Sequence, residues 1–367
     1  MHGRLLSLPS DCHPAYALSM QVLLLSSPGV QELTDLPRPD PAPGEVRIRV
    51  AACGICGSDV HGFTGETGRR IPPLVMGHEA AGTVDALGSG VSDLEPGDRV
   101  AIDSTVFCGG CEFCRTGREN LCGQREVLGV SCGTYRRHGC FAEFVVVPRR
   151  GVYRLPEGLD FVTAALLEPL TIALHASRLG GASPATRSAV VVGCGMIGLA
   201  VIAALRAKGV PRIAAVDLDP GRLAEAARHG AGEIFEAGDD AGRRAGQWAA
   251  AGSDDFDGGD LVIEAVGTTA AVQTAIAAAC RGGRVVLVGN VAPTVEIPLQ
   301  QVVTREITIL GSCASAGCYP EAIELVATGQ VDLRGFVSRV VPLAEGVAWF
   351  KRLQCREPGL IKVILEP

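Results

Sequence analysis

The chain has 367 residues, of which 47% are hydrophobic and 20% charged, with a formal net charge of −7. This length exceeds the usual size of one hydrophobic core and predicts two globular domains. The acidic balance argues against a nucleic acid as partner, because that polyanion is bound by basic surfaces. We therefore expect a small-molecule ligand.

The fourteen cysteines are compatible with disulfides or with metal binding. Because the chain is long, rich in core residues and without a recognisable secretory signal, reduced thiols fit better. Residues 1–19 are broken by proline and charge, and we predict an N-terminal extension there. The apolar run 189–205 contains glycines and is shorter than the roughly 20 residues of a membrane span. We expect a soluble, cytoplasmic protein without a membrane partner.

Short strand-like runs separated by Gly, Pro and Asp turns fill the chain from residue 21 to about residue 148. This texture predicts a β-rich, barrel-like domain. Four of these runs occupy residues 45–54, 77–88, 96–102 and 139–148.

Two segments in this region contain candidate metal ligands. GICGSDVHGF carries Cys56, Ser58 and His61, and VMGHEAAG carries His78 and Glu79. Cysteine, histidine and glutamate form a mixed ligand set, and three protein ligands with one open position are typical of a catalytic zinc. Taken singly, each residue also has an ordinary structural role in a core or a turn.

Four more cysteines lie in one loop rich in glycine and charge: Cys108, Cys111, Cys114 and Cys122. Four thiolates so close suit a closed, tetrahedral structural zinc. An iron–sulfur cluster is the rival interpretation, but the bacterial ferredoxin pattern requires a fourth cysteine after three residues, followed by proline. Here the gap is seven residues and glycine follows. We predict a structural zinc.

Beyond about residue 163, strands alternate with helix-length segments. This pattern predicts a parallel sheet with crossover helices. Residues 237–259 are predicted to form a solvated helix and loop, and residues 335–367 are predicted to rejoin the first domain. The predicted strands are 188–193, 212–219, 260–267, 283–289 and 305–312, and the clearest helices are 196–209 and 221–230.

The segment VVVGCGMIG has GxGxxG spacing directly after a buried strand and at the start of a helix. Gly193 permits the tight turn, Gly195 lets a pyrophosphate approach the backbone, and Gly198 allows close helix packing. Met196 and Ile197 lie in the first helical turn, where free N–H groups favour phosphate. The motif predicts a dinucleotide site.

Asp217 ends the next predicted strand, 19 residues after Gly198. A carboxylate there binds the adenosine ribose hydroxyls and repels a 2′-phosphate, which favours NAD over NADP. Arg222 lies nearby and could accommodate some NADP, although a solvated helix arginine is the commoner interpretation.

These motifs, in this order, resemble the medium-chain zinc-dependent dehydrogenases, and most closely the sorbitol (polyol, L-iditol) dehydrogenase branch. The resemblance runs from about Met20 to the end of the chain. It implies a GroES-like catalytic domain of residues 20–167 and 317–367, an inserted Rossmann NAD-binding domain of residues 168–316, and a homotetramer or homodimer. It rests on GICGSDVH, GHEAAGTVDALGSGV, PGDRVAI, the four-cysteine loop, GCFAEFVVVP, LLEPLTIALHA, GCGMIG and REITILGS.

The resemblance assigns Cys56, His78 and Glu79 to a catalytic zinc, so that two zinc ions bind per chain. Glu168 in LLEP matches a glutamate that holds a water at the zinc or binds the metal directly. His175 is expected to pack the domain junction.

Zinc would lower the pKa of a substrate hydroxyl, and a hydride would pass from a secondary alcohol of a polyol to NAD. Ser58 and His61 match the spacing of the proton relay in related alcohol dehydrogenases. We expect them to carry the substrate proton away from the site.

The chain departs from the sorbitol dehydrogenase pattern at two places. It has Gly62 and Phe63 where Tyr-Trp is typical, and Ala314 and Ser315 where Arg-Tyr is typical. Loss of bulk and charge predicts a wider cleft and a bulkier polyol, such as a cyclitol or a sugar derivative. The two cysteines in the second segment are expected to pack in apolar surroundings; they are Cys313 and Cys318.

Two other functions stay open. An L-threonine-type amino alcohol dehydrogenase shares GCFAEF and the four-cysteine loop, although LLEPLTIALHA argues against it. A catalytically inactive, NAD-binding structural protein is the alternative from another class. Such relatives commonly lose metal ligands, which are all present here.

Overall fold

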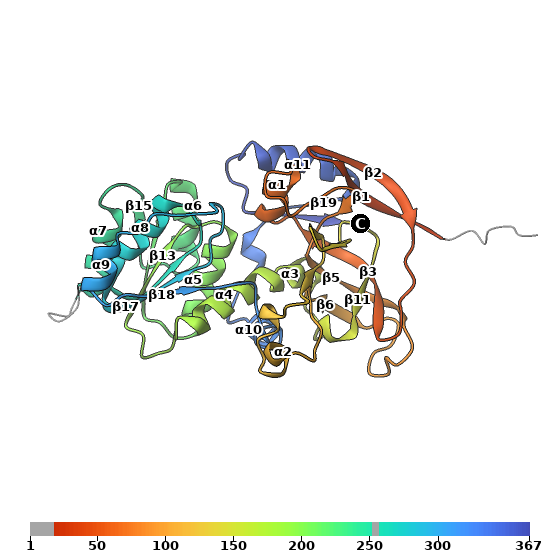
Figure 1. Cartoon of the computed structure of the whole chain (residues 1–367), viewed down its shortest axis with the longest axis horizontal. Coiled ribbons are helices and arrows are strands. Elements are labelled where there is room, and N and C mark those ends of the chain that lie inside the picture. Colours follow the sequence, from red (N-terminus) through yellow and green to blue (C-terminus); the bar gives the residue numbers. More distant parts are fainter. Residues whose placement is uncertain (1–17, 252–256) are drawn as a thin grey trace, which may run out of the picture.

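The computed structural model describes residues 18–251 and 257–367. Two domains lie side by side along the long axis of the molecule (Figure 1). The predicted N-terminal extension falls outside the described residues, except for Leu18 and Ser19. None of the helices in the described ranges combines the length and the apolar character that crossing a bilayer requires.

The catalytic domain is built on a sheet to which both the early and the final strands of the chain contribute. The strand order is β12-β6-β5-β3-β20-β19, and β11 also pairs with β3. Antiparallel pairing of β20 with β3 joins Leu365 to Cys53 and returns the tail to the first domain, as predicted. The strands are β3 (Glu45–Gly54), β5 (Glu79–Leu87), β6 (Arg99–Ile102), β11 (Phe144–Pro148), β12 (Val152–Arg154), β19 (Val337–Pro342) and β20 (Lys362–Glu366).

Smaller sheets and short helices complete this domain. The order β2-β1-β4 forms one small sheet, and β7-β8 and β9-β10 form two ribbons. Phe141 and Phe350 meet edge to face in the core, with ring centroids 5.7 Å apart. These elements are β1 (Ser19–Ser27), β2 (Val30–Pro37), β4 (Leu74–Val75), β7 (Thr105–Val106), β8 (Glu126–Val127), β9 (Val130–Cys132), β10 (Tyr135–Arg137), α1 (Gly57–Phe63), α2 (Glu112–Arg115), α3 (Phe161–Ala165) and α11 (Gly346–Gln354).

The second domain is a six-stranded parallel sheet in the order β15-β14-β13-β16-β17-β18. The strands are β13 (Ser188–Val192), β14 (Arg212–Asp217), β15 (Glu233–Glu236), β16 (Gly259–Glu264), β17 (Ala279–Leu287) and β18 (Thr308–Gly311). The helices are α4 (Leu167–Leu179), α5 (Met196–Ala207), α6 (Pro220–Arg228), α7 (Ala241–Ala250), α8 (Thr269–Ala278) and α9 (Leu299–Thr304). The predicted Rossmann fold is confirmed.

Both faces of this sheet are covered, which explains the nearly continuous apolar runs of its strands. Successive residues of β13 point to opposite faces: Val191 packs in the cluster that includes α5, and Val190 packs in the cluster that includes α7 and α8. The strand order reverses between β13 and β16. A dinucleotide binds at such a switch point, at the carboxyl ends of the strands.

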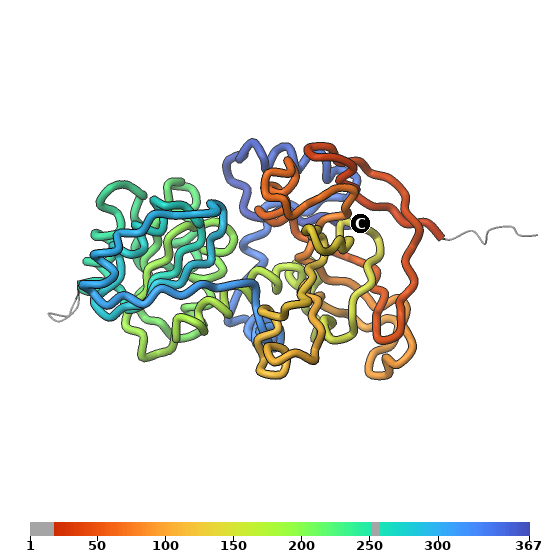
Figure 2. Tube along the Cα trace, viewed as in Figure 1, coloured from red at the N-terminus to blue at the C-terminus, as the bar shows by residue number. Residues whose placement is uncertain are grey.

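The two domains share a hydrophobic junction. One buried cluster contains Ala52 and Ala81 of the catalytic sheet together with Leu170 of α4. Tyr319, the first residue of α10 (Tyr319–Ala327), donates a hydrogen bond of 2.7 Å to the carbonyl of Ile102. Figure 2 shows the chain entering the second domain and returning to the first. The predicted boundaries fall at the start of α4 and between β18 and α10, and they stay predictions.

Candidate active site

Three candidate metal ligands meet where two central strands of the catalytic sheet, β3 and β5, end beside each other. The register of β3 and β5 places Gly54 opposite Glu79, and Cys56 follows as the N-terminal cap of α1. The Cys56 sulfur, a ring nitrogen of His78 and a carboxylate oxygen of Glu79 all lie within 4.8 Å of one another. This spacing and the sulfur, nitrogen and oxygen donors fit one zinc ion with an open position.

Behind His78 lies a carboxylate that sequence reasoning missed. Asp59 Oδ1 is 3.4 Å from His78 Nδ1, and Asp59 is completely buried. Burial alone would raise the pKa of Asp59. The charges of His78 and Arg70 lower it by a larger amount, so that the pKa is well below its ordinary value. A carboxylate in this place orients the ring of a metal-binding histidine. Asp59 follows Cys56 by three residues, and this spacing was the only available signal.

Glu79 is held by a second unpredicted residue. Lys362 Nζ donates to both carboxylate oxygens of Glu79, at 2.8 and 2.6 Å, and to the carbonyl of Ile55 at 3.1 Å. Burial lowers the pKa of Lys362, but the charge of Glu79 raises it above its ordinary value overall. Gly54 gives the glutamate room, because a Cβ there would be 2.2 Å from Glu79 Oε2. Lys362 therefore shares the carboxylate with any metal bound at the site.

Glu168 lies in the first turn of α4, near the three ligands but not among them. Burial is the main reason that the pKa of Glu168 is raised to about 7. The charge of His78 lowers this pKa by a smaller amount, and the charge of Glu79 raises it. A carboxyl group with that pKa exchanges a proton in the neutral range. Its predicted role, holding a water at the metal or binding the metal directly, stays a prediction.

The two predicted relay residues are on α1, and both are exposed. Ser58 Oγ accepts a hydrogen bond of 3.2 Å from Arg70 Nη2. In the part of the chain that the structure describes, no hydrogen bond joins Ser58 to His61 directly. The relay therefore stays a prediction.

The glycine-rich turn after β13 has the geometry that a dinucleotide requires. Gly193 has φ of 93°, and a Cβ at Gly198 would lie 1.8 Å from the Gly193 carbonyl oxygen. Gly195 is the N-terminal cap of α5 and has open space where its Cβ would be. Half-buried Met196 and Ile197 follow in the first helical turn. A pyrophosphate can therefore approach the helix N-terminus.

Asp217 lies at the carboxyl end of β14 beside this turn. Its Oδ2 accepts from the Cys194 backbone N–H at 2.6 Å, and its Oδ1 accepts from that of Asp219 at 2.9 Å. Each carboxylate oxygen keeps a second lone pair, which a ribose hydroxyl can use. Arg222 is exposed nearby on α6.

The four sulfurs of the cysteine loop lie within 4.8 Å of one another, so the predicted cluster forms. Cys108 Sγ accepts hydrogen bonds from the backbone N–H groups of Gly110 and Cys111, at 3.4 and 3.3 Å. These hydrogen bonds, of which the one from Gly110 has the largest effect, lower the pKa of Cys108 to about 6. Thiolates are the metal-binding form of cysteine. Desolvation raises the pKa of Cys114, so the convergence of the four sulfurs is the observation that fits a structural zinc, with Cys114 and Cys122 as the other two ligands.

The structure corrects two expectations about the substrate side. Gly62 is buried, and a Cβ there would be 2.2 Å from Arg70 Cγ. The expected widening at Gly62 is therefore wrong, because Arg70 fills the space. Cys318 packs in the core as predicted, but Cys313 is exposed and its sulfur accepts from Arg125 Nη1 at 3.3 Å. Apolar packing of Cys313 was thus a wrong prediction.

The domain junction contains His175, as predicted. Its ring is buried, with Nε2 3.4 Å from Asn120 Nδ2 and Nδ1 3.4 Å from Arg178 Nη2. Close by, Ser315 Oγ accepts from Thr171 Oγ1 at 3.0 Å.

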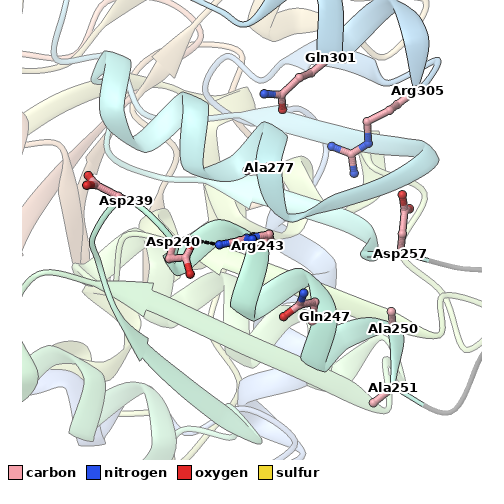
Figure 3. Close-up of a pocket in the computed structure, with 10 residues that line it drawn as sticks. All are labelled: Asp239, Asp240, Arg243, Gln247, Ala250, Ala251, Asp257, Ala277, Gln301 and Arg305. Carbon is pink, nitrogen blue, oxygen red and sulfur yellow. Dashed lines mark hydrogen bonds and ion pairs between the residues drawn. The ribbon is translucent and has the colours of Figure 1, made fainter.

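A separate hollow of about 800 Å³ lies on the outer side of the second domain (Figure 3). Both acidic and basic side chains line this hollow, among them Asp240, Arg243, Asp257 and Arg305. None of the predicted site residues borders this hollow, so it is not part of the site described above.

Comparison with known proteins places these features in one family. Residues 42–157 match the family described as Alcohol dehydrogenase GroES-like domain, and residues 197–328 match Zinc-binding dehydrogenase. The chain therefore belongs to the medium-chain, zinc-dependent alcohol dehydrogenases.

Within this family the chain falls in the sorbitol dehydrogenase branch. It is 35% identical to sorbitol dehydrogenase of Bacillus subtilis (strain 168) over 341 residues, which cover 92% of this chain and 94% of the relative. A short chain alcohol dehydrogenase from Escherichia coli CFT073, complexed with NADH, is 28% identical, with a TM-score of 0.86 and coverage of 95% and 99%. A zinc-binding dehydrogenase from Sinorhizobium meliloti 1021, bound to NADP, is 32% identical, with a TM-score of 0.82 and coverage of 95% and 100%. The chain is an alcohol/polyol dehydrogenase.

Proposed function

We propose that this protein oxidises a secondary alcohol group of a polyol with NAD as the hydride acceptor, and that it holds two zinc ions per chain. The observation that carries the proposal is the convergence of Cys56, His78 and Glu79 within 4.8 Å. A zinc ion there would act as a Lewis acid toward the substrate hydroxyl. The similarity to sorbitol dehydrogenase supports a polyol as substrate.

The water at the metal and the substrate proton are assigned to three residues of this chain. Glu168, in the first turn of α4, would hold a water at the zinc or bind the metal directly. The Ser58 oxygen would accept the substrate proton as the hydroxyl releases its own proton to His61, through the nicotinamide ribose hydroxyl or directly. His61, exposed at the surface of α1, would then pass that proton to solvent. This order follows the spacing of the residues along α1.

The choice of NAD rests on Asp217. A 2′-phosphate would bring negative charge against this carboxylate, whereas ribose hydroxyls can donate to it. Exposed Arg222 is the feature that could weaken the preference. We further propose a cytoplasmic homo-oligomer and the domain boundaries given above.

The preference for a bulky or cyclic polyol now rests on Ala314 alone, because Arg70 occupies the space beside Gly62. Ala314 has φ of 50° and is half-buried in the segment between β18 and α10. An alanine there offers a substrate neither charge nor a hydroxyl group.

A substrate and cofactor screen tests the proposal. NAD and NADP reduction is measured with linear polyols, cyclic polyols, sugars and amino alcohols. We expect turnover with NAD and a polyol, loss of turnover in Cys56→Ser, and retention in Cys355→Ser, which changes an exposed cysteine outside both clusters. A faster reaction with linear than with every cyclic polyol would overturn the cyclitol preference. Turnover of amino alcohols alone would favour the threonine-type alternative.

A further inference from the structure

A buried arginine connects the predicted relay serine to the carboxylate behind the metal-binding histidine. Arg70 is 5% exposed and lies in the segment between α1 and β4. Its Nη2 donates to Asp59 Oδ1 at 2.9 Å and to Ser58 Oγ at 3.2 Å. Its Nε donates to the same Asp59 oxygen at 3.3 Å, and its Nη1 donates to the Arg69 carbonyl at 3.2 Å.

This arginine is built into the site and is not an open ligand for substrate. A guanidinium has five N–H groups, and these hydrogen bonds use four of them. A buried charge requires a partner, and Arg70 finds one in completely buried Asp59. Arg70 therefore acts through its neighbours.

Gly62 is what admits Arg70 to this position. A Cβ at residue 62 would lie 2.2 Å from Arg70 Cγ and 3.2 Å from Arg70 Cβ. These atoms are the stem of the side chain, so even alanine at residue 62 would displace the whole arginine. The glycine that replaces the usual tyrosine thus makes room for a cation.

We propose that Arg70 is a positioning residue of the dehydrogenase reaction and that Gly62 is required for its placement. Arg70 fixes the Asp59 carboxylate, whose Oδ1 lies 3.4 Å from His78 Nδ1, and so would help to hold the His78 ring in the orientation in which it binds a metal. The mechanism rests on the proposed catalytic role of the Cys56, His78 and Glu79 site.

Arg70 also orients the relay hydroxyl. Because a guanidinium only donates, the Ser58 hydroxyl proton must point away from Arg70. One charged group thereby sets both the histidine ring and the serine hydroxyl.

The test compares Arg70→Met, Arg70→Lys and Gly62→Ala with Arg69→Met, which changes the exposed neighbouring arginine. The first measurement is the rate at which a colorimetric chelator removes zinc from the purified protein. The second is the visible absorption of the cobalt-substituted protein, and the third is kcat and KM for NAD and a polyol. Thermal unfolding followed by circular dichroism verifies that each variant is folded.

We expect Arg70→Met and Gly62→Ala to release one of the two zinc ions up to roughly 10- to 100-fold faster and to lower kcat similarly, because they free Asp59, and loss of such an outer partner of a metal ligand has effects of this size. KM for NAD should stay within about twofold, the cobalt spectrum should shift, and Arg70→Lys should recover part of the loss. If Arg70→Met does not fold, the proposal is tested by comparing Arg70→Lys and Gly62→Ala with the control Arg69→Met.

Zinc release, spectrum and kcat within twofold of Arg69→Met in all folded variants would overturn the proposal. A wild-type protein that oxidises no alcohol while Arg70→Met still releases zinc faster would instead refute the proposed function and leave the positioning role intact. The two failures are therefore distinguishable.

Discussion

Lys362→Met isolates the contribution of the buried lysine to the active site. Lys362 and Glu79 have side chains that are 2% and 1% exposed, and the amine lies 2.6 Å from the nearer carboxylate oxygen. Methionine keeps most of the apolar stem but leaves the carboxylate charge without its partner. Removal of one member of a buried ion pair costs about 3–5 kcal/mol, because the remaining charge stays desolvated. We expect the free energy of unfolding of the zinc-free protein to fall by that amount.

The assay is urea unfolding of the zinc-free protein, with Lys351→Met as the control because Lys351 is exposed. The double variant Lys362→Met with Glu79→Gln should recover much of the loss, since no unpaired charge is then buried. Added zinc should stabilise Lys362→Met more than the wild type, because the metal takes over the charge of Glu79. A Lys362→Met loss within about 1 kcal/mol of the control, or no recovery in the double variant, would refute this reasoning.

Three further predictions concern other sites. Burial raises the pKa of Asp103 to about 7, so the folded state keeps a proton that the unfolded chain releases near pH 4, and stability falls as pH rises between these values. In Asp103→Asn the amide oxygen can still accept the hydrogen bond from the Thr105 N–H. In chemical unfolding, this substitution should therefore stabilise the protein by up to roughly 4 kcal/mol more at about pH 8 than at about pH 4. An equal effect at both pH values would contradict this. Asp217→Ala should raise KM for NAD by roughly tenfold, about 1.4 kcal/mol, and lower that for NADP, and unchanged NAD kinetics would refute its role. Cys111→Ser should remove one zinc in metal analysis and lower the melting temperature, whereas two retained zinc ions would disprove the structural site.

Much of the fold was predictable because its signals are local. The central strand β13 is a fully buried and almost wholly apolar run, and the glycine turn that follows it carries its own conformational requirement at Gly193. The cysteine loop was equally visible, because all four ligands fall within fifteen residues of sequence. Such patterns do not depend on distant packing.

Two of the errors depend on contacts between distant parts of the chain, and the one at Gly62 depends on how a nearby loop folds back. Lys362 reaches Glu79 across 283 positions because β20 pairs with β3, and a lysine in an apolar strand gives no sign of its partner. The space beside Gly62 was misjudged because Arg70 folds back over α1. Cys313 was misjudged because the neighbouring Arg125 comes from the cysteine-loop side of the molecule.

The most direct test of the account is NAD reduction with a polyol as a function of the zinc bound per chain. Zinc is removed with a chelator and added back to the wild type, to Cys56→Ser and to the control Cys355→Ser. We predict that activity vanishes without zinc, returns in the wild type and the control as the second ion binds, and never returns in Cys56→Ser. Full activity of the zinc-free protein, or of Cys56→Ser, would contradict a catalytic zinc held by Cys56, His78 and Glu79.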